Sequence, residues 1–182
     1  LQLITTGPNA NPTTSVQNVG SVTANGVEGS ITIRPISGLS IYNSLSYAHS
    51  TFDQNLMTSS GLENIKGKLI PNYPTFMYKG SIAYNWKGFN THIDGNYISH
   101  RYLTYTNDTK VPGYFLVNFG TGYRFENTPI LKNVTLSFNI DNLFNKTYIA
   151  TTGELGNSFS GSPQSFLMGA PRQFFGTISA DF

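Results

Sequence analysis

Three histidines and one neighbouring carboxylate are the residues of this chain whose types and spacing could support catalysis or metal binding. His92 and Asp94 are two residues apart, so in a strand they share a face, as a general base and its orienting carboxylate would. Ser99 has the opposite parity to both, and no other serine is placed as a nucleophile. His92 and His100 share a face but lie roughly 25 Å apart along an extended strand, too far to ligate one ion. We expect no enzyme activity and no catalytic, metal-binding or cofactor-binding residue.

The composition argues against several other functions. The chain has no cysteine, so a disulfide, a Cys-zinc site or a Cys nucleophile is impossible. Charged residues are only 11% of the chain, against about 25% in soluble domains. The net charge is +2 and the basic residues are dispersed, so we expect no nucleic-acid partner. No apolar run reaches the roughly 18 residues that indicate a transmembrane helix.

The elements that must position the histidines and Asp94 are strands, because apolar and polar residues alternate along one segment of the chain after another. In one segment Tyr78, Ile82 and Trp86 share a face, while Ser81 lies on the other. The strands of an outer-membrane barrel alternate in this way, with the apolar face toward lipid and the polar face toward the lumen. Asn43 interrupts one apolar row. The alternating segments are 27–34, 39–48, 76–87, 89–97, 114–125, 134–141 and 173–182.

The connections between these segments alternate in length. Outer-membrane barrels have short periplasmic turns and longer extracellular loops, so this alternation favours an up-and-down antiparallel barrel. Trp86, Phe89 and Phe125 then fall at the periplasmic boundary, where an aromatic belt is expected. The short connections are 35–38, 87–88 and 127–133, and the long ones are 7–12, 55–73, 105–113 and 150–171.

The predicted fold is therefore an all-β, antiparallel, up-and-down transmembrane β-barrel. Residues 1–6 are too few for a spanning strand, which needs about 9–11 residues. We interpret residues 1–182 as the C-terminal portion of a longer barrel, contributing its last strands, about eight in number. A complete, closed barrel of about eight strands is the alternative, since that is the smallest bacterial barrel.

Two motifs near the C-terminus carry a family resemblance. A penultimate strand ends in Asn142-Leu143-Phe144-Asn145 followed by Tyr148, and the last strand follows Gly169-Ala170-Pro171-Arg172 and ends at Phe182. In these features the chain resembles TonB-dependent outer-membrane receptors. The resemblance implies a barrel of about 22 strands. It also implies an N-terminal plug domain and an energy-coupling box, neither of which is present in residues 1–182. The Asn142–Tyr148 motif itself is typical of structural turn chemistry rather than ligand binding.

The resemblance implies a receptor in the Gram-negative outer membrane that takes up a scarce nutrient, most often a ferric siderophore. Its implied partners are outer-membrane lipid, the nutrient ligand, the barrel-assembly machinery, and the TonB complex through the missing N-terminal part. The terminal strand, with Phe174, Ile178 and Phe182, resembles the signal that the assembly machinery reads. The alternatives are a small complete barrel with a structural or adhesive role and, less favoured, an outer-membrane barrel enzyme.

Ligand recognition is expected in the long loops, where aromatic and basic residues could contact an anionic or aromatic ligand. The alternative for these side chains is interface anchoring and loop packing. The candidates are Arg101, Tyr102, Tyr105, Phe159, Phe166, Met168 and Arg172.

Overall fold

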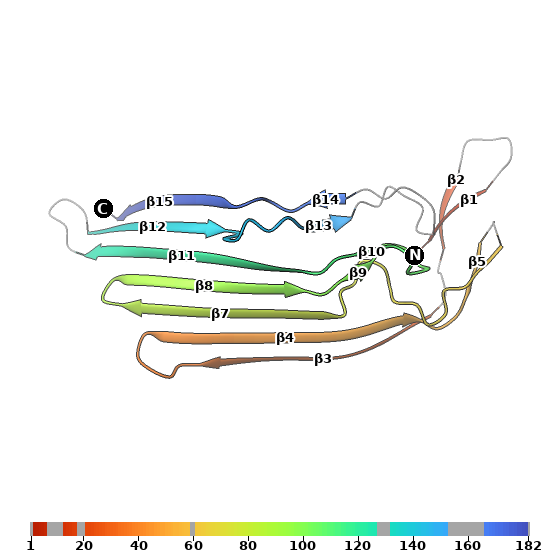
Figure 1. Ribbon diagram of the computed structural model, residues 1–182, viewed down its shortest axis with the longest axis horizontal. Coiled ribbons are helices and arrows are strands. Elements are labelled where there is room, and N and C mark those ends of the chain that lie inside the picture. Colours follow the sequence, from red (N-terminus) through yellow and green to blue (C-terminus); the bar gives the residue numbers. More distant parts are fainter. Residues whose placement is uncertain are drawn as a thin grey trace.

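The computed structural model describes residues 2–6, 13–17, 21–58, 61–126, 132–152 and 166–181. All regular elements in these residues are β-strands, and none of the described segments is a helix that could cross a membrane. Seven strands form one antiparallel sheet in which each strand pairs with the next (Figure 1). They are β3 (Val22–Ile33), β4 (Leu39–Phe52), β7 (Phe76–Trp86), β8 (Phe89–Ile98), β11 (Tyr114–Glu126), β12 (Asn133–Asp141) and β15 (Gln173–Asp181). This order confirms the predicted up-and-down topology.

The remaining strands form short hairpins at the end of the sheet where the long connections lie (Figure 1). The short turns lie at the opposite end, beside the C-terminus, as the alternation predicts. We refer to the two as the long-loop end and the short-turn end. The hairpins pair β1 (Gln2–Thr6) with β2 (Thr13–Gln17), β5 (Leu56–Thr58) with β6 (Gly61–Glu63), β9 (Arg101–Tyr102) with β10 (Lys110–Val111), and β13 (Ile149–Thr152) with β14 (Phe166–Met168).

The predicted count of about eight strands includes residues 1–6 as a truncated strand beside the sheet, and this part of the prediction is wrong. In the described residues β1 pairs only with β2, from Gln2 opposite Gln17 to Thr6 opposite Thr13, in a sheet of its own. Residues 13–17 fold back along β1 as its partner strand, and the first strand of the large sheet begins only at Val22. The edges of the seven-stranded sheet are therefore β3 and β15, and these two strands do not pair with each other. The described strands thus form an open wall rather than a closed barrel of eight.

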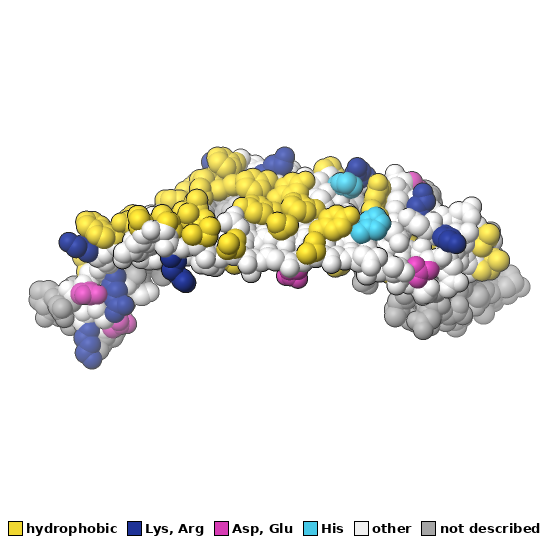
Figure 2. Space-filling model, turned by 90° about the horizontal axis from the view of Figure 1, so that it is seen from below, with side chains coloured by type: hydrophobic (Ala, Val, Ile, Leu, Met, Phe, Trp, Pro, Cys, Tyr) yellow, Lys and Arg dark blue, Asp and Glu magenta, His cyan; other side chains and the backbone are white. Residues whose placement is uncertain are grey.

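The register brings the predicted apolar rows onto one face of the sheet. Residues directly opposite each other in paired strands share a face. One row runs across all seven strands and contains no polar side chain: Ile33, Ile41, Ile82, Ile93, Phe119, Ile140 and Phe174. No second layer covers this apolar face in the described residues, and Ile82 is 48% exposed. Figure 2 shows the hydrophobic side chains as a band along one side of the curved sheet. An uncovered apolar face of this size requires an apolar environment.

Asn43, the polar residue that interrupts an apolar row, has a partner within the same face. Register places it opposite Gly80. The ring of Tyr78 lies over Gly80, and the Tyr78 hydroxyl donates a hydrogen bond to Asn43 Oδ1 at 2.5 Å. A buried or lipid-facing amide without such a partner would be destabilising. The interruption therefore does not break the apolar face.

The opposite face is polar. Tyr42, Ser81, Asp94 and Asn118 lie in one register row of this polar face. The row beside it places His92 and Asn139 on either side of Gly120. The predicted division into an apolar and a polar face is confirmed on both sides of the sheet.

Candidate functional site

The buried core of the described residues lies at the long-loop end rather than along the sheet. A single sheet has no second layer to bury its side chains, so dense packing occurs only where the connections fold over one another. Ile65 is fully buried and Val111 nearly so. We call this packed region the loop cluster; its other buried apolar members include Phe52 and Leu103.

The first half of the loop cluster is the β4–β7 connection, which folds back along the end of β4. Backbone hydrogen bonds join Phe52 to Lys68 and to Gly67, at 3.1 and 2.8 Å. Ile70 N–H donates to Ser50 C=O at 3.1 Å. These bonds extend the ladder of β4 beyond the sheet, so this connection is held like a strand.

The second half of the loop cluster is the β9–β10 hairpin with its loop, and Asn107 in that loop joins it to the first half. Its side-chain Oδ1 accepts from Leu69 N–H at 2.7 Å, and its Nδ2 donates to Leu69 C=O at 2.8 Å. The amide therefore pairs with the Leu69 backbone as a neighbouring strand would. Asn107 has φ = 58°, a conformation that asparagine tolerates better than most residues. A backbone bond from Asn72 to Tyr102, at 2.7 Å, adds a second link.

Three predicted ligand residues lie in or beside the loop cluster. Arg101 is buried, and its Nη2 donates to the carbonyls of Ile149 and Ala150 at 3.0 and 3.1 Å, so it ties β9 to β13. The Tyr105 ring lies 5.4 Å from that of Phe52. Tyr102 is half-buried on β9.

Tyr102 is accompanied by two side chains that sequence reasoning did not select. Lys110 Nζ lies 5.9 Å from the Tyr102 ring centroid, and the His100 ring meets the Tyr102 ring edge-on at 5.9 Å. Lys110 is opposite Tyr102 in the β9–β10 hairpin. The sequence contains no signal for this pairing, because the register of so short a hairpin is set by the loop around it.

Three other predicted ligand residues do not join the loop cluster. Phe166 and Met168 are exposed on β14. Arg172 is exposed, and its guanidinium lies 5.6 Å from the Phe174 ring. Phe159 lies outside the described residues.

The Asn142–Tyr148 motif is built around the side chain of Asn142. Asn142 is 4% exposed and has φ = 53°. Its Nδ2 donates to the carbonyls of Lys146 and Ala170 at 2.8 and 3.0 Å, and its Oδ1 accepts from Lys146 N–H at 2.7 Å. Its own N–H donates to Asn118 Oδ1 at 2.9 Å. One side chain therefore closes a turn and binds the segment that leads into the last strand.

The rest of the motif contacts that same segment. Asn145 Oδ1 accepts from Arg172 N–H at 3.0 Å. Tyr148 packs against Gly169, where a Cβ would lie 1.9 Å from the ring, and its ring centroid is 4.5 Å from that of Tyr114. Leu143 N–H donates to the carbonyl of Val117 at 2.7 Å, while Phe144 is exposed. These contacts hold the motif against the segment that leads into the last strand.

The histidine and carboxylate considered for catalysis lie together on the polar face. His92 Nε2 is 3.5 Å from Asp94 Oδ2, and both side chains are partly exposed. His92 and Asn139 reach over Gly120 so closely that a Cβ there would meet both. Within the described ranges, no group of three or more His, Cys, Asp or Glu residues could hold a metal ion.

A family model, TonB dependent receptor-like, beta-barrel, matches residues 2–143, well over half of the chain. The chain belongs to the TonB-dependent receptor β-barrel family. Proteins of this family lie in the Gram-negative outer membrane, so the apolar face is the lipid-facing face and the polar face lines the lumen. The short-turn end is then periplasmic and the long-loop end extracellular.

Solved TonB-dependent receptors share the fold. The ferric citrate transporter FecA in the unliganded form matches with a TM-score of 0.71 and 18% identity, over 88% of this chain and 24% of FecA. The siderophore receptor PiuA from Acinetobacter baumannii gives 0.70 and 19%, over 97% and 23%. BauA, the ferric preacinetobactin receptor from the same organism, gives 0.70 and 25%, over 94% and 23%. The chain spans about a quarter of the length of these proteins. No curated protein sequence matches it.

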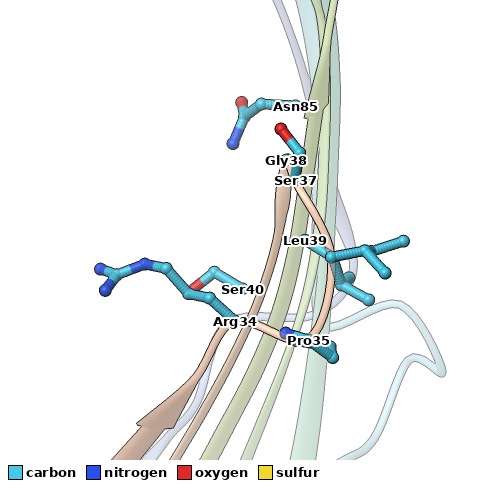
Figure 3. Close-up of a pocket in the computed structure, with 8 residues that line it drawn as sticks. Arg34, Pro35, Ser37, Gly38, Leu39, Ser40 and Asn85 are labelled. Atoms are coloured by element: carbon cyan, nitrogen blue, oxygen red, sulfur yellow. The ribbon is translucent and has the colours of Figure 1, made fainter.

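The receptor wall also has a shallow pocket, at the periplasmic turn between β3 and β4. Arg34, Ser40 and Asn85 line it from one side of the turn, whereas Leu39 and Pro35 extend to the other (Figure 3). Asn85 N–H donates to the carbonyl of Gly38 at 2.9 Å, which fixes the turn against β7. The pocket lies at the opposite end of the sheet from the loop cluster, so it is no part of the candidate ligand site.

One extracellular carboxylate secures the edge of the wall. Asp53 follows β4, and its N–H donates to the carbonyl of Ser21 at 3.0 Å. Side-chain hydrogen bonds from Thr23 and Ser21 lower the pKa of Asp53 below its ordinary value. These hydrogen bonds join the start of β3 to the residue that follows β4.

Proposed function

We propose that this chain is the C-terminal part of the barrel of a TonB-dependent receptor that takes up a scarce nutrient, with a ferric siderophore as the first candidate. The observation that carries the proposal is the loop cluster. Two long connections are joined into one packed unit at the extracellular end of a lipid-facing wall. Binding residues concentrate on loops held by a rigid scaffold.

The open sheet supports a larger parent barrel. Its edges, β3 and β15, carry unpaired backbone groups in the described residues, and such groups cannot face hydrocarbon. Further strands, about 22 in all in plugged transporters, would pair with both edges. The plug domain and TonB contact would then belong to the N-terminal part of the parent protein.

The siderophore proposal draws on the similar structures. FecA, PiuA and BauA are named for ferric citrate, a siderophore and ferric preacinetobactin. Their identity to this chain is 25% or lower, so they support an iron-chelate ligand as a class rather than a particular molecule. The receptor would bind and pass this ligand without changing it chemically.

Within the loop cluster we propose Tyr102, Tyr105 and Lys110 as ligand contacts. An ammonium group beside aromatic rings suits an anionic or aromatic chelate. The buried guanidinium of Arg101 would position this hairpin through the β13 carbonyls. Phe159, Phe166, Met168 and Arg172, on or just after the connection 150–171, would contact the ligand from outside the loop cluster.

The test is uptake of radioactive iron, presented on a panel of siderophores, by cells that carry the parent receptor as their only such receptor. We expect uptake of at least one chelate, lost in a strain without TonB. Tyr102→Ala and Lys110→Gln should weaken binding of that chelate, whereas exposed Lys66→Gln should not. Undiminished uptake without TonB would contradict the transport mechanism. Unchanged binding in both loop variants would contradict the site alone.

A further inference from the structure

The tip of the β7–β8 hairpin places a lysine over the only tryptophan of the chain. Lys87 Nζ lies 5.2 Å from the Trp86 ring centroid, and Trp86 is 58% exposed. Register places Trp86 opposite Phe89, and Phe89 opposite Tyr123. All three rings are exposed on the apolar face at the periplasmic end. We call Trp86, Phe89 and Tyr123 the aromatic floor.

The backbone of this turn is unusual for a lysine. Lys87 has φ = 44° and Gly88 has φ = 82°. Two-residue hairpin turns with two positive φ angles favour Asn followed by Gly, because a longer side chain makes the first position less favourable. A lysine at this position is therefore not explained by turn formation. Its ammonium group is the feature that asparagine could not supply.

The ammonium of Lys87 has no carboxylate partner within the described part of the chain. Basic residues outnumber acidic ones at this end: Arg34, Lys87, Arg124 and Lys132 against Glu126 and Asp181. One of the two acids, Asp181, already accepts a hydrogen bond from Asn133 at 3.0 Å. In Figure 2 a basic side chain adjoins the left end of the hydrophobic band, the short-turn end. An anionic group outside the chain would therefore meet a net positive rim.

We propose that Lys87 and the aromatic floor bind the phosphate headgroup of an anionic phospholipid in the periplasmic leaflet. The aromatic floor continues the lipid-facing surface, so a lipid is the molecule that lies against it. Aromatic rings of this kind sit at headgroup level, where they contact the glycerol region. The Lys87 ammonium then lies at the depth of the lipid phosphates, where it can contact one of them. A net negative headgroup gains from this charge, whereas the choline of a zwitterionic lipid opposes it.

The experiment measures which lipids the purified parent receptor retains, by native mass spectrometry from micelles containing equal phosphatidylglycerol and phosphatidylcholine. Lys87→Gln should reduce phosphatidylglycerol retention about five-fold, as expected for one basic residue at an anionic lipid surface. Phosphatidylcholine retention should not change. Lys87→Arg should keep the preference. Lys79→Gln is the matched control, because Lys79 is exposed on the lumen face of β7, the strand that leads into this turn.

Three outcomes would overturn the proposal. The first is equal phosphatidylglycerol retention by the wild type and Lys87→Gln. The second is displacement of the lipid by millimolar glycerol phosphate, which would indicate a site for small soluble anions. The third is loss of retention in Lys87→Gln that is matched in Lys79→Gln. Heat-modifiable migration on gels shows that each variant is folded before it is compared.

Discussion

The side-chain amide of Asn142 donates a hydrogen bond to the carbonyl oxygen of Ala170 across 28 residues of chain. Asn142 directly follows β12, the penultimate strand of the seven-stranded sheet, and Ala170 lies shortly before β15, its last strand. The two C-terminal motifs are therefore halves of one structural unit. Asn145 with Arg172, and Tyr148 with Gly169, complete the same junction.

Replacing Asn142 with alanine should destabilise this junction by about 2–4 kcal/mol, since it removes three part-buried hydrogen bonds worth about 1 kcal/mol each. Asparagine also tolerates the positive φ at this position better than alanine. Urea unfolding of the parent receptor in vesicles measures the loss. Lys146→Ala is the control, because Asn142 bonds only its backbone. Equal stability of Asn142→Ala and wild type would show that the junction is not needed.

Gly169→Ala should also destabilise the junction, by about 1–3 kcal/mol, the usual cost of overpacking. The new methyl group would overlap the Tyr148 ring, which packs on Tyr114. Gly176→Ala in the last strand has open space around its Cβ and serves as the control. The same unfolding assay compares the two, and a larger loss for Gly176→Ala would contradict the packing described here.

The division of the sheet into an apolar and a polar face could be predicted from sequence because the side-chain period of a strand is two. Ile82 and Ser81 differ in face whatever their neighbours are. Asn43 shows the limit of this reasoning. Its Tyr78 partner is on another strand, so only the register reveals that the apolar face tolerates it.

The candidate site was harder to predict than the wall. Asn107 lies in a polar Thr-Asn-Asp sequence that predicts a turn, and nothing in it indicates a bond to Leu69 in another loop. The charge of Arg101 predicts a ligand contact, yet its guanidinium donates hydrogen bonds to carbonyls of β13. Contacts between long loops depend on how the wall brings them together, and strand periodicity contains no information on that.

Removing the Asn107 side chain should loosen the loop cluster without unfolding the wall. In Asn107→Ala the Leu69 N–H loses its acceptor, so its hydrogen exchange should accelerate at least ten-fold, equivalent to about 1.4 kcal/mol. Exchange of amides in the middle of β8 should stay slow. Asn64→Ala, an exposed substitution in the same connection, is the control. Unchanged exchange at Leu69 would mean that Asn107 does not join the two loops.

Shortening the last strand should impair assembly more than ligand binding. Deleting Phe182, or replacing Phe174 or Ile178 with a polar residue, removes apolar side chains from the predicted assembly signal. We expect strongly reduced amounts of the parent receptor in the outer membrane, and normal ligand affinity in the fraction that folds. Quantitative immunoblotting of outer membranes measures the first quantity. Wild-type amounts of the Phe182 deletion would contradict this role.

The central claim is that one face of this sheet contacts lipid and the other lines a lumen. These 182 residues have no cysteine, so in a parent receptor otherwise free of cysteine a fluorophore can be attached at Ile82→Cys or at Ser81→Cys, adjacent residues of β7 on opposite faces. The measurement is quenching of each label by brominated lipids in vesicles that contain the folded parent receptor. We predict strong quenching at position 82 and little at position 81. Equal quenching at both positions, or stronger quenching at 81, would contradict the account.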